Sequence, residues 1–277
     1  MAKAAAGDKR FAAPKPLSSH GPARIIAMCN QKGGVGKTTT AINMSAALAE
    51  YGRKILLIDF DPQGALSAGL GVAAHDVTTI YDLMLDRTID PHDAIQHTAN
   101  ENLDVIPANI ELSAAEMKLI NEISRERILA NILKQVAADY DLIVIDCQPS
   151  LGLLTVNALT AAHGVIIPLA TEFFALRGVA ILEDIINKVR EGLNPALQLD
   201  GILATMVDNR TLHSREVLER LHEAFGDKVF KTEIHRTVKF PDATVAQAPI
   251  TAFAPTSDAA EVYRTVAREL VARGCAA

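Results

Sequence analysis

Hydrophobic residues from position 24 onwards form short runs that alternate with longer stretches of periodic apolar character. Each run has four to six residues that are nearly all apolar. This pattern is typical of strands that are buried on both faces of a parallel sheet. The runs predict strands at residues 25–29, 55–59, 103–106, 142–146, 165–169 and 202–207.

The longer stretches carry apolar residues at three- and four-residue spacing and contain few helix-breaking residues. Such spacing places the apolar side chains on one face of a helix. The stretches predict helices at residues 38–50, 113–138, 151–162, 176–191, 214–225 and 257–273. Ser257 is suited to cap the start of the last helix, and Gly274 is suited to end it. The alternation predicts one α/β domain, residues 24–277, with a doubly wound, mostly parallel sheet and helices on both faces.

Residues 1–23 differ from this domain in composition. They are rich in Ala, Lys, Pro, Ser and Gly and show no apolar period, so we expect a disordered tail. The tail is basic, with one acidic residue against four basic ones: Asp8, Lys3, Lys9, Arg10 and Lys15. It is either a solvated leader without a specific role or a segment that makes weak contacts with nucleic acid or a membrane.

The net charge, the apolar runs and the cysteines argue against several classes of protein. The net charge of −6 argues against a protein coated in basic residues but leaves room for a local basic patch. No uncharged apolar run approaches the length of about 18 residues that indicates a membrane span, so we expect no membrane insertion. Cys29, Cys147 and Cys275 are odd in number and far apart, which disfavours a disulfide framework and fits the cytoplasm.

A glycine-rich segment joins the first predicted strand to the first predicted helix. It consists of Lys32, Gly33, Gly34, Val35, Gly36, Lys37, Thr38 and Thr39. Glycines let the backbone curl so that several N–H groups point at one anion, and the helix N-terminus adds its positive dipole end. Lys37 is placed to reach the β- and γ-phosphates, and the Thr38 hydroxyl suits Mg²⁺. The segment therefore predicts a P-loop that binds ATP and Mg²⁺.

Three carboxylates end two of the predicted strands. Asp59 and Asp61 close the second strand, and Asp146 closes the fourth. The carboxyl ends of parallel strands line the ligand crevice of such a sheet. Asp59 and Asp61 share a side of an extended segment, so one can organise the Mg²⁺ shell while the other holds the attacking water. Asp146 follows an apolar strand, as in a Walker B motif, and is expected to hold Mg²⁺ directly or through water.

The pattern KGGxGKTT at residues 32–39 resembles the deviant Walker A group of P-loop NTPases. This group includes ParA, MinD, nitrogenase iron proteins and some amide-forming ligases. The segments that begin at Asp59, Asp146 and Thr205 look like the short, chromosomal ParA/Soj branch. The segments depart from that branch at Gln148, where proline is usual, and at Ala65, where asparagine is common.

The resemblance implies roles for particular residues. Lys32 acts in trans on the phosphates of a partner subunit in an ATP-bound homodimer, where a second cation stabilises phosphoryl transfer. Asp61 positions the attacking water, and Asp59 lies near the metal. The expected catalytic residues are therefore Lys32, Lys37 and Asp61, and the expected metal-site residues are Thr38, Asp59, Asp61 and Asp146. In the relatives, the adenine is flanked by segments that correspond here to Met206, Asn209, Pro241 and Asp242.

Basic residues near the C-terminus are candidates for DNA contacts. Residues 228–240 carry four basic side chains against one acidic one, and Arg264, Arg268 and Arg273 recur on roughly one face of the last predicted helix. Such a stripe would bind phosphates without regard to sequence and with strong salt dependence. It is otherwise a solvated face balanced by glutamates. The DNA-contact candidates are Arg210, Lys231, Arg236, Lys239, Arg264 and Arg268.

The resemblance implies a DNA-partitioning ATPase associated with the nucleoid. Its ATP-bound dimer would bind nonspecific double-stranded DNA, and a ParB-type adaptor would stimulate its weak intrinsic ATP hydrolysis. Two alternatives are related ATPases: a MinD-like membrane ATPase and an ATPase that positions another cargo. Three others differ in chemistry: an iron–sulfur reductase, a ligase of the dethiobiotin type, and a binding module in which ATP only stabilises the structure.

Overall fold

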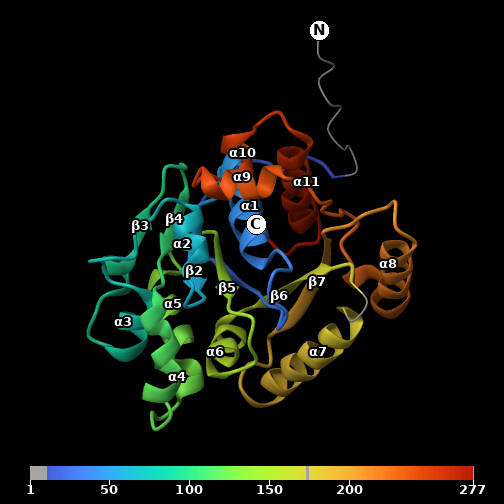
Figure 1. Cartoon of the computed structure of the whole chain (residues 1–277). Coiled ribbons are helices and arrows are strands. Elements are labelled where there is room, and N and C mark those ends of the chain that lie inside the picture. Colours follow the sequence, from blue (N-terminus) through green and yellow to red (C-terminus); the bar gives the residue numbers. More distant parts are fainter. Residues whose placement is uncertain (1–10, 173–174, 277) are drawn as a thin grey trace.

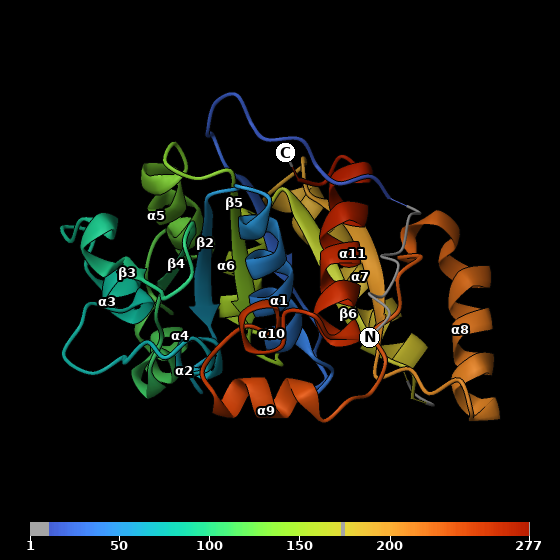
Figure 2. The same ribbon diagram turned by 90° about the horizontal axis from the view of Figure 1, so that it is seen from above.

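The computed structural model describes residues 11–172 and 175–276. Its centre is a seven-stranded sheet in the order β3-β4-β2-β5-β1-β6-β7, in which only the β3–β4 pair is antiparallel within the described residues. The strands are β1 (Arg24–Met28), β2 (Ile55–Phe60), β3 (Gln96–His97), β4 (Leu103–Ile106), β5 (Leu142–Cys147), β6 (Gly164–Ala170) and β7 (Gln198–Thr205). Helices cover both faces (Figures 1 and 2), which confirms the predicted doubly wound α/β fold.

Two apolar layers flank the sheet. The first packs under α1 (Lys37–Glu50), α2 (Ala65–Gly69), α9 (Lys239–Val245), α10 (Ile250–Phe253) and α11 (Asp258–Ala272). The second packs under α3 (Ile80–Leu85), α4 (Ala115–Lys118), α5 (Ile128–Val136), α6 (Leu153–Ala161), α7 (Ala175–Gly192) and α8 (Leu212–Phe225). Ile26 and Met28 of β1 face the first layer, whereas Ile25 and Ala27 face the second. This double burial explains the continuous apolar runs.

The six predicted strands are confirmed, and β7 differs most in its bounds. It begins at Gln198, four residues before the predicted start at position 202. The reason is the buried Asp200, whose carboxylate accepts a hydrogen bond of 2.8 Å from Arg24 of β1. An ion pair thus lies inside a strand where the apolar pattern predicts none. The two-residue edge strand β3 was too short to leave a pattern.

The prediction of one long helix at residues 113–138 is wrong. The structure divides this region into a 3₁₀ turn (Ile110–Ala114), α4, a second 3₁₀ turn (Arg125–Arg127) and α5. Ser124 has a φ of 57°, which breaks the helix before Arg125. The break is held by Asn157 of α6, which donates to the Arg125 carbonyl at 2.9 Å and accepts from the Leu129 N–H at 3.2 Å. A tertiary contact therefore overrides the local helical period.

Several short helices were not predicted, since three to seven residues are too few to show a helical period. They are α2, α3, α9, α10 and 3₁₀ turns at Pro91–Ala94 and Gly226–Lys228. The other predicted helices are present, and the Ser257 hydroxyl accepts from the Ala260 N–H at 3.2 Å at the start of α11. No helix of the described residues is both long and apolar enough to span a membrane.

The predicted tail lies partly outside the described residues, which begin at position 11. Residues 11–22 contain no helix or strand. The end of this stretch is attached to the α/β domain. Asp141 accepts a hydrogen bond from the Gly21 N–H at 2.9 Å, and its carboxylate lies 2.7 Å from His20 Nδ1. The Ala23 N–H donates to the Ala137 carbonyl at 2.7 Å. Residues 20–23 are therefore attached to the domain by hydrogen bonds, before the predicted boundary at residue 24.

Candidate nucleotide site

The glycine-rich loop connects β1 to α1 at the carboxyl edge of the sheet, with β1 between β5 and β6 (Figure 1). Gly34 and Gly36 have φ angles of 72° and 86°, in the left-handed region that side chains disfavour. Gly36 immediately precedes the first residue of α1. The backbone thus turns into the helix N-terminus where a phosphate would meet free N–H groups and the positive dipole end.

The two lysines of the loop have different environments. Lys37 is the first residue of α1; it is buried, and its Nζ donates to the Lys32 carbonyl at 3.2 Å. The side chain of Lys32 is half exposed and forms an ion pair with Glu172. Its backbone N–H donates to Asn30 Oδ1 at 2.9 Å, and Asn30 Nδ2 donates to the Pro168 carbonyl at 2.8 Å. Asn30 therefore fixes the start of the loop against β6 and leaves the Lys32 side chain at the surface.

Asp146 is one of two buried carboxylates of the site. It is the last residue but one of β5 and lies next to Asp59 of β2, its paired residue in the sheet register. Neither carboxylate oxygen has a hydrogen-bond partner of normal geometry among the described residues. Burial raises the pKa of Asp146 to about 8, and the neighbouring Thr38 hydroxyl lowers it by a smaller amount. A buried carboxylate with unused acceptor oxygens, beside a hydroxyl and a phosphate loop, fits a hard cation such as Mg²⁺.

Asp59 and Asp61 differ in what they hold. Asp59 Oδ2 accepts from the Ser67 N–H at 2.9 Å and from its hydroxyl at 2.7 Å, which ties β2 to α2. Burial raises the pKa of Asp59 to about 6 against these hydrogen bonds. Asp61 lies half-buried beyond the strand and accepts from the Gln63 N–H at 3.0 Å. The hydrogen bonds of Asp59 therefore serve the scaffold, whereas the Asp61 side chain stays partly exposed.

No group of three or more His, Cys, Asp and Glu with metal-binding geometry occurs in residues 11–172 and 175–276. Mg²⁺ does not require such a cage, since it keeps several waters and takes one or two carboxylates together with substrate phosphates. Thr38 and Asp146 together offer one hydroxyl and one carboxylate, which is as many protein ligands as Mg²⁺ usually takes at a phosphate site.

An apolar cavity of about 770 Å³ adjoins the loop. This volume lies in the usual range for small-molecule sites. Met206 and Pro241 line the cavity, as predicted for the base, whereas Asn209 and Asp242 are not among its lining residues. Gly36 and Thr39 of the phosphate loop also line the cavity, so the cavity and the loop can hold two parts of one ligand.

Aromatic residues form a wall of the cavity that the sequence did not predict. Phe240 and Tyr263 line it and pack edge to face, with ring centroids 5.4 Å apart. The Tyr263 hydroxyl lies 3.3 Å from Thr40 Oγ1. Phe240 directly precedes Pro241, which was predicted to flank the base, so this adjacency could have identified Phe240 from the sequence. Tyr263 reads as an ordinary core residue of α11, and only the packing of α11 on α1 brings it to the cavity.

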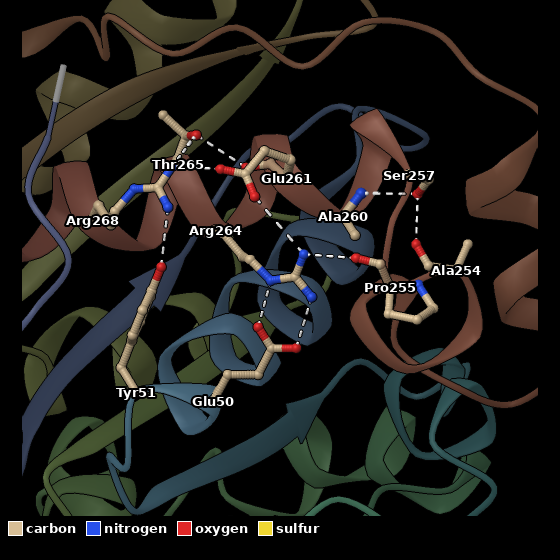
Figure 3. Close-up of polar contacts among 10 residues, drawn as sticks. All are labelled: Glu50, Tyr51, Ala254, Pro255, Ser257, Ala260, Glu261, Arg264, Thr265 and Arg268. Carbon is tan, nitrogen blue, oxygen red and sulfur yellow. Dashed lines mark hydrogen bonds and ion pairs between the residues drawn. The ribbon is translucent and has the colours of Figure 1, made fainter. Parts of the chain in front are cut away.

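Two arginines of the predicted DNA stripe hold α11 against α1 (Figure 3). Arg264 forms two hydrogen bonds to Glu50, of 2.6 and 3.0 Å. Arg268 donates to the Tyr51 hydroxyl at 3.1 Å and to Glu261 at 2.7 Å. Their side chains are only 20% and 11% exposed. These guanidinium groups are engaged within the chain, so the structure gives them a stabilising role.

The other DNA-contact candidates are exposed, and most lie near the base cavity. Arg210 is 90% exposed and pairs with Asp208, while Arg236 is 64% exposed. Lys239 is exposed at the start of α9, and Lys231 is exposed between β7 and α9. A bridge between residues 207 and 235 places the loop of Arg210 beside the segment of Arg236. These two segments therefore form a basic edge next to the cavity.

Comparisons with known proteins agree with this geometry. A family described as AAA domain matches residues 23–199. The Bacillus subtilis sporulation initiation inhibitor protein Soj is 47% identical over 252 residues, which cover 91% of this chain and 99% of Soj. The Myxococcus xanthus chromosome partitioning protein ParA is 44% identical over 252 residues, which cover 90% of this chain and 88% of ParA.

A solved structure adds ligands to the comparison. A Mycobacterium smegmatis protein named cobyrinic acid a,c-diamide synthase superposes with a TM-score of 0.79 at 39% identity, covering 90% of this chain and 94% of that one. It has been solved with ADP and magnesium and with an ATP analogue and magnesium. Since relatives above 40% identity span nearly the whole chain, the chain belongs to the ParA/Soj family of chromosome-partitioning P-loop ATPases.

Proposed function

We propose that this chain is a DNA-partitioning ATPase whose affinity for DNA is controlled by ATP. The observation that carries the proposal is the arrangement of Lys32, Lys37, Asp61 and Asp146 around one phosphate loop. It combines a second, exposed lysine with an accessible carboxylate and a buried one. The basic edge formed by Arg210 and Arg236 supports the DNA-binding part of the proposal.

The chain's own residues suggest how the nucleotide is held. The phosphates lie on the N–H groups of the loop, and Lys37 exchanges its bond to the Lys32 carbonyl for the β- and γ-phosphates. Thr38 and Asp146 would hold Mg²⁺, which neutralises phosphate charge when it is bound. The base occupies the apolar cavity between Met206 and the aromatic wall.

Hydrolysis requires an oriented water and charge stabilisation. Asp61, half-buried just beyond β2, accepts a proton from, or orients, the attacking water. Lys32 reaches the phosphates of a partner subunit in an ATP-bound homodimer and stabilises the charge that spreads over their oxygens. Intrinsic turnover is slow, and a ParB-type adaptor accelerates it, so that DNA release occurs where the adaptor is.

The exposed basic residues bind DNA in this proposal, and the arginines of α11 do not. Arg210, Arg236, Lys231 and Lys239 contact the phosphate backbone without reading bases. Dimer formation places two such edges on one particle, so ATP raises DNA affinity through the dimer population. On this proposal the protein acts on the nucleoid in the cytoplasm.

The experiment that tests the proposal compares two surfaces in the presence of Mg·ATP: duplex DNA of arbitrary sequence and anionic liposomes. We expect ATP-dependent retention on DNA and none on liposomes. Retention on liposomes alone would replace the proposal by a MinD-like membrane function. Slow release of phosphate in the absence of any small carboxylic acid further separates an ATPase from an amide-forming ligase.

A further inference from the structure

The side chain of Lys32 has a partner within its own chain. Its Nζ pairs with Oε2 of Glu172, and the two side chains are 49% and 47% exposed. Glu172 follows β6, the strand beside β1, so the two residues come from neighbouring loops at the carboxyl edge of the sheet. Lys32 Nζ cannot keep this contact while it touches the phosphates of another subunit. The ion pair therefore competes with the proposed action in trans.

The backbone around Glu172 is held in place. Its N–H donates to the Ala170 carbonyl at 2.7 Å, and its carbonyl accepts from the Ala175 N–H at 2.9 Å at the start of α7. The preceding Thr171 lies 2.8 Å from Ser214 of α8 through the two side-chain oxygens. These contacts fix the position from which the carboxylate extends. Lys32 has the longer side chain of the two partners, so it can reach further from its backbone.

A second cation lies near the same carboxylate. Arg236 NH2 is 4.0 Å from Oε1 of Glu172, whereas Lys32 contacts the other carboxylate oxygen, Oε2. When Lys32 leaves, the carboxylate therefore keeps a positive neighbour. Arg236 also lines the apolar cavity, so Glu172 pairs with a residue of the phosphate loop and lies near a residue of the base cavity.

We propose that Glu172 is a positioning residue that holds Lys32 within the subunit and thereby opposes formation of the ATP-bound dimer. This inference rests on the proposed function, because it assumes that Lys32 acts in trans. Lys32 must exchange its bond to Glu172 for a bond to the phosphates of the partner subunit. The negative charge of Glu172 further repels those phosphates. The ion pair therefore weakens the dimer by a small factor, until ATP supplies a stronger partner for the lysine.

The test measures the dissociation constant of the dimer by sedimentation equilibrium with Mg²⁺ and a nonhydrolysable ATP analogue. Glu172→Gln removes the charge but keeps the size of the side chain. Because exposed ion pairs are weak, we expect a dimer that is tighter by roughly two- to fivefold. The gain should shrink at high salt, since such pairs are screened. Equal melting temperatures establish that the variant is folded.

Glu191→Gln is the matched control. Glu191 is an exposed glutamate near the end of α7 with no ion pair in the described part of the chain, and its replacement changes the net charge by the same amount. We expect it to leave the dimer affinity unchanged. A Lys32→Ala background supplies the second control, because Glu172→Gln should have no effect when its partner lysine is absent.

The outcomes separate this inference from the proposed function. If the wild type stays monomeric with the analogue, the proposed ATP dimer fails. If the wild type dimerises but Glu172→Gln equals it or weakens it, the role of Glu172 is wrong. The inference is also overturned if Glu172→Gln restores or strengthens dimers of Lys32→Ala, because the glutamate would then act independently of the lysine.

Discussion

Asp59 and Asp146 occupy paired positions on neighbouring strands, yet their surroundings give them different tasks. Asp59 accepts two hydrogen bonds from Ser67, whereas the buried carboxylate oxygens of Asp146 have no hydrogen-bond partner among the described residues. Burial raises the pKa of both groups, and the pKa of Asp146 rises to about 8. A cation would reverse this effect at Asp146, because it favours the ionised form. The chain is thus strained electrostatically where Mg²⁺ is expected to bind.

A pH series tests the environment of Asp146. Its pKa is raised from an ordinary 3.8 to about 8 in the folded chain without ligands. Unfolding therefore releases a proton between these values, and the stability present at low pH is lost as the pH rises towards 8. We expect the free energy of unfolding to fall with pH more steeply in the wild type than in Asp146→Asn, by at most about 1.4 kcal/mol per pH unit. Chemical denaturation in EDTA between pH 5 and 8 measures both slopes, and equal slopes would refute this assignment.

Replacing Asp61 separates ATP binding from ATP hydrolysis. The Asp61 side chain is partly exposed, and the hydrogen bond printed for it among the described residues is a local one from the Gln63 N–H. We expect Asp61→Ala to bind ATP with nearly the wild-type affinity and to hydrolyse it about 100-fold more slowly, as for loss of a general base. Fluorescent-nucleotide titration and phosphate release measure the two quantities. A variant that binds ATP poorly but turns over normally would remove Asp61 from its proposed role.

At the scale of elements, α11 is fixed to α1 by arginines that the sequence pattern assigned to DNA. The bidentate pair of Arg264 and Glu50 joins the two helices, and Tyr263 of α11 reaches the base cavity from the same interface. The position of α11 thus affects the nucleotide site as well as stability.

Arg264 and Arg236 form a matched pair for testing this division. Arg264→Ala should lower the free energy of unfolding by about 1 kcal/mol, since it breaks a partly buried bidentate ion pair. Arg236→Ala should leave stability nearly unchanged, because its side chain is exposed, and should weaken DNA binding. Denaturation and DNA titration on both variants measure these effects. If Arg264→Ala alone weakened DNA binding, the stripe on α11 would be the DNA surface after all.

The six longer strands were predictable because burial on both faces makes them continuous apolar runs. The phosphate loop was predictable because its chemistry lies in consecutive residues, from Lys32 to Thr39. The break at Ser124 was not, since it depends on Asn157 from a helix about 30 residues later. The partners of Lys32 and Arg264 were also beyond the sequence pattern, because Glu172 and Glu50 lie far from them along the chain.

At the scale of the whole molecule, the phosphate loop, the base cavity and the basic edge lie close together. Arg236 links them, because it lines the cavity, neighbours Glu172 and belongs to the exposed basic segment. A ligand at the loop would therefore change the surroundings of a residue proposed to contact DNA. This closeness supports a coupling between ATP and DNA, in which each raises the affinity for the other by the same factor.

The most direct test is the affinity for duplex DNA of arbitrary sequence without nucleotide, with ADP and with ATP, at two salt concentrations. We expect only Mg·ATP to strengthen binding, by at least tenfold at the lower salt, with a marked loss at the higher salt. Lys32→Ala should abolish the gain from ATP while leaving ATP binding to the monomer intact. If the affinity were the same in all three nucleotide states, or if Lys32→Ala kept the full gain, the account of an ATP-dependent dimer that binds DNA would be contradicted.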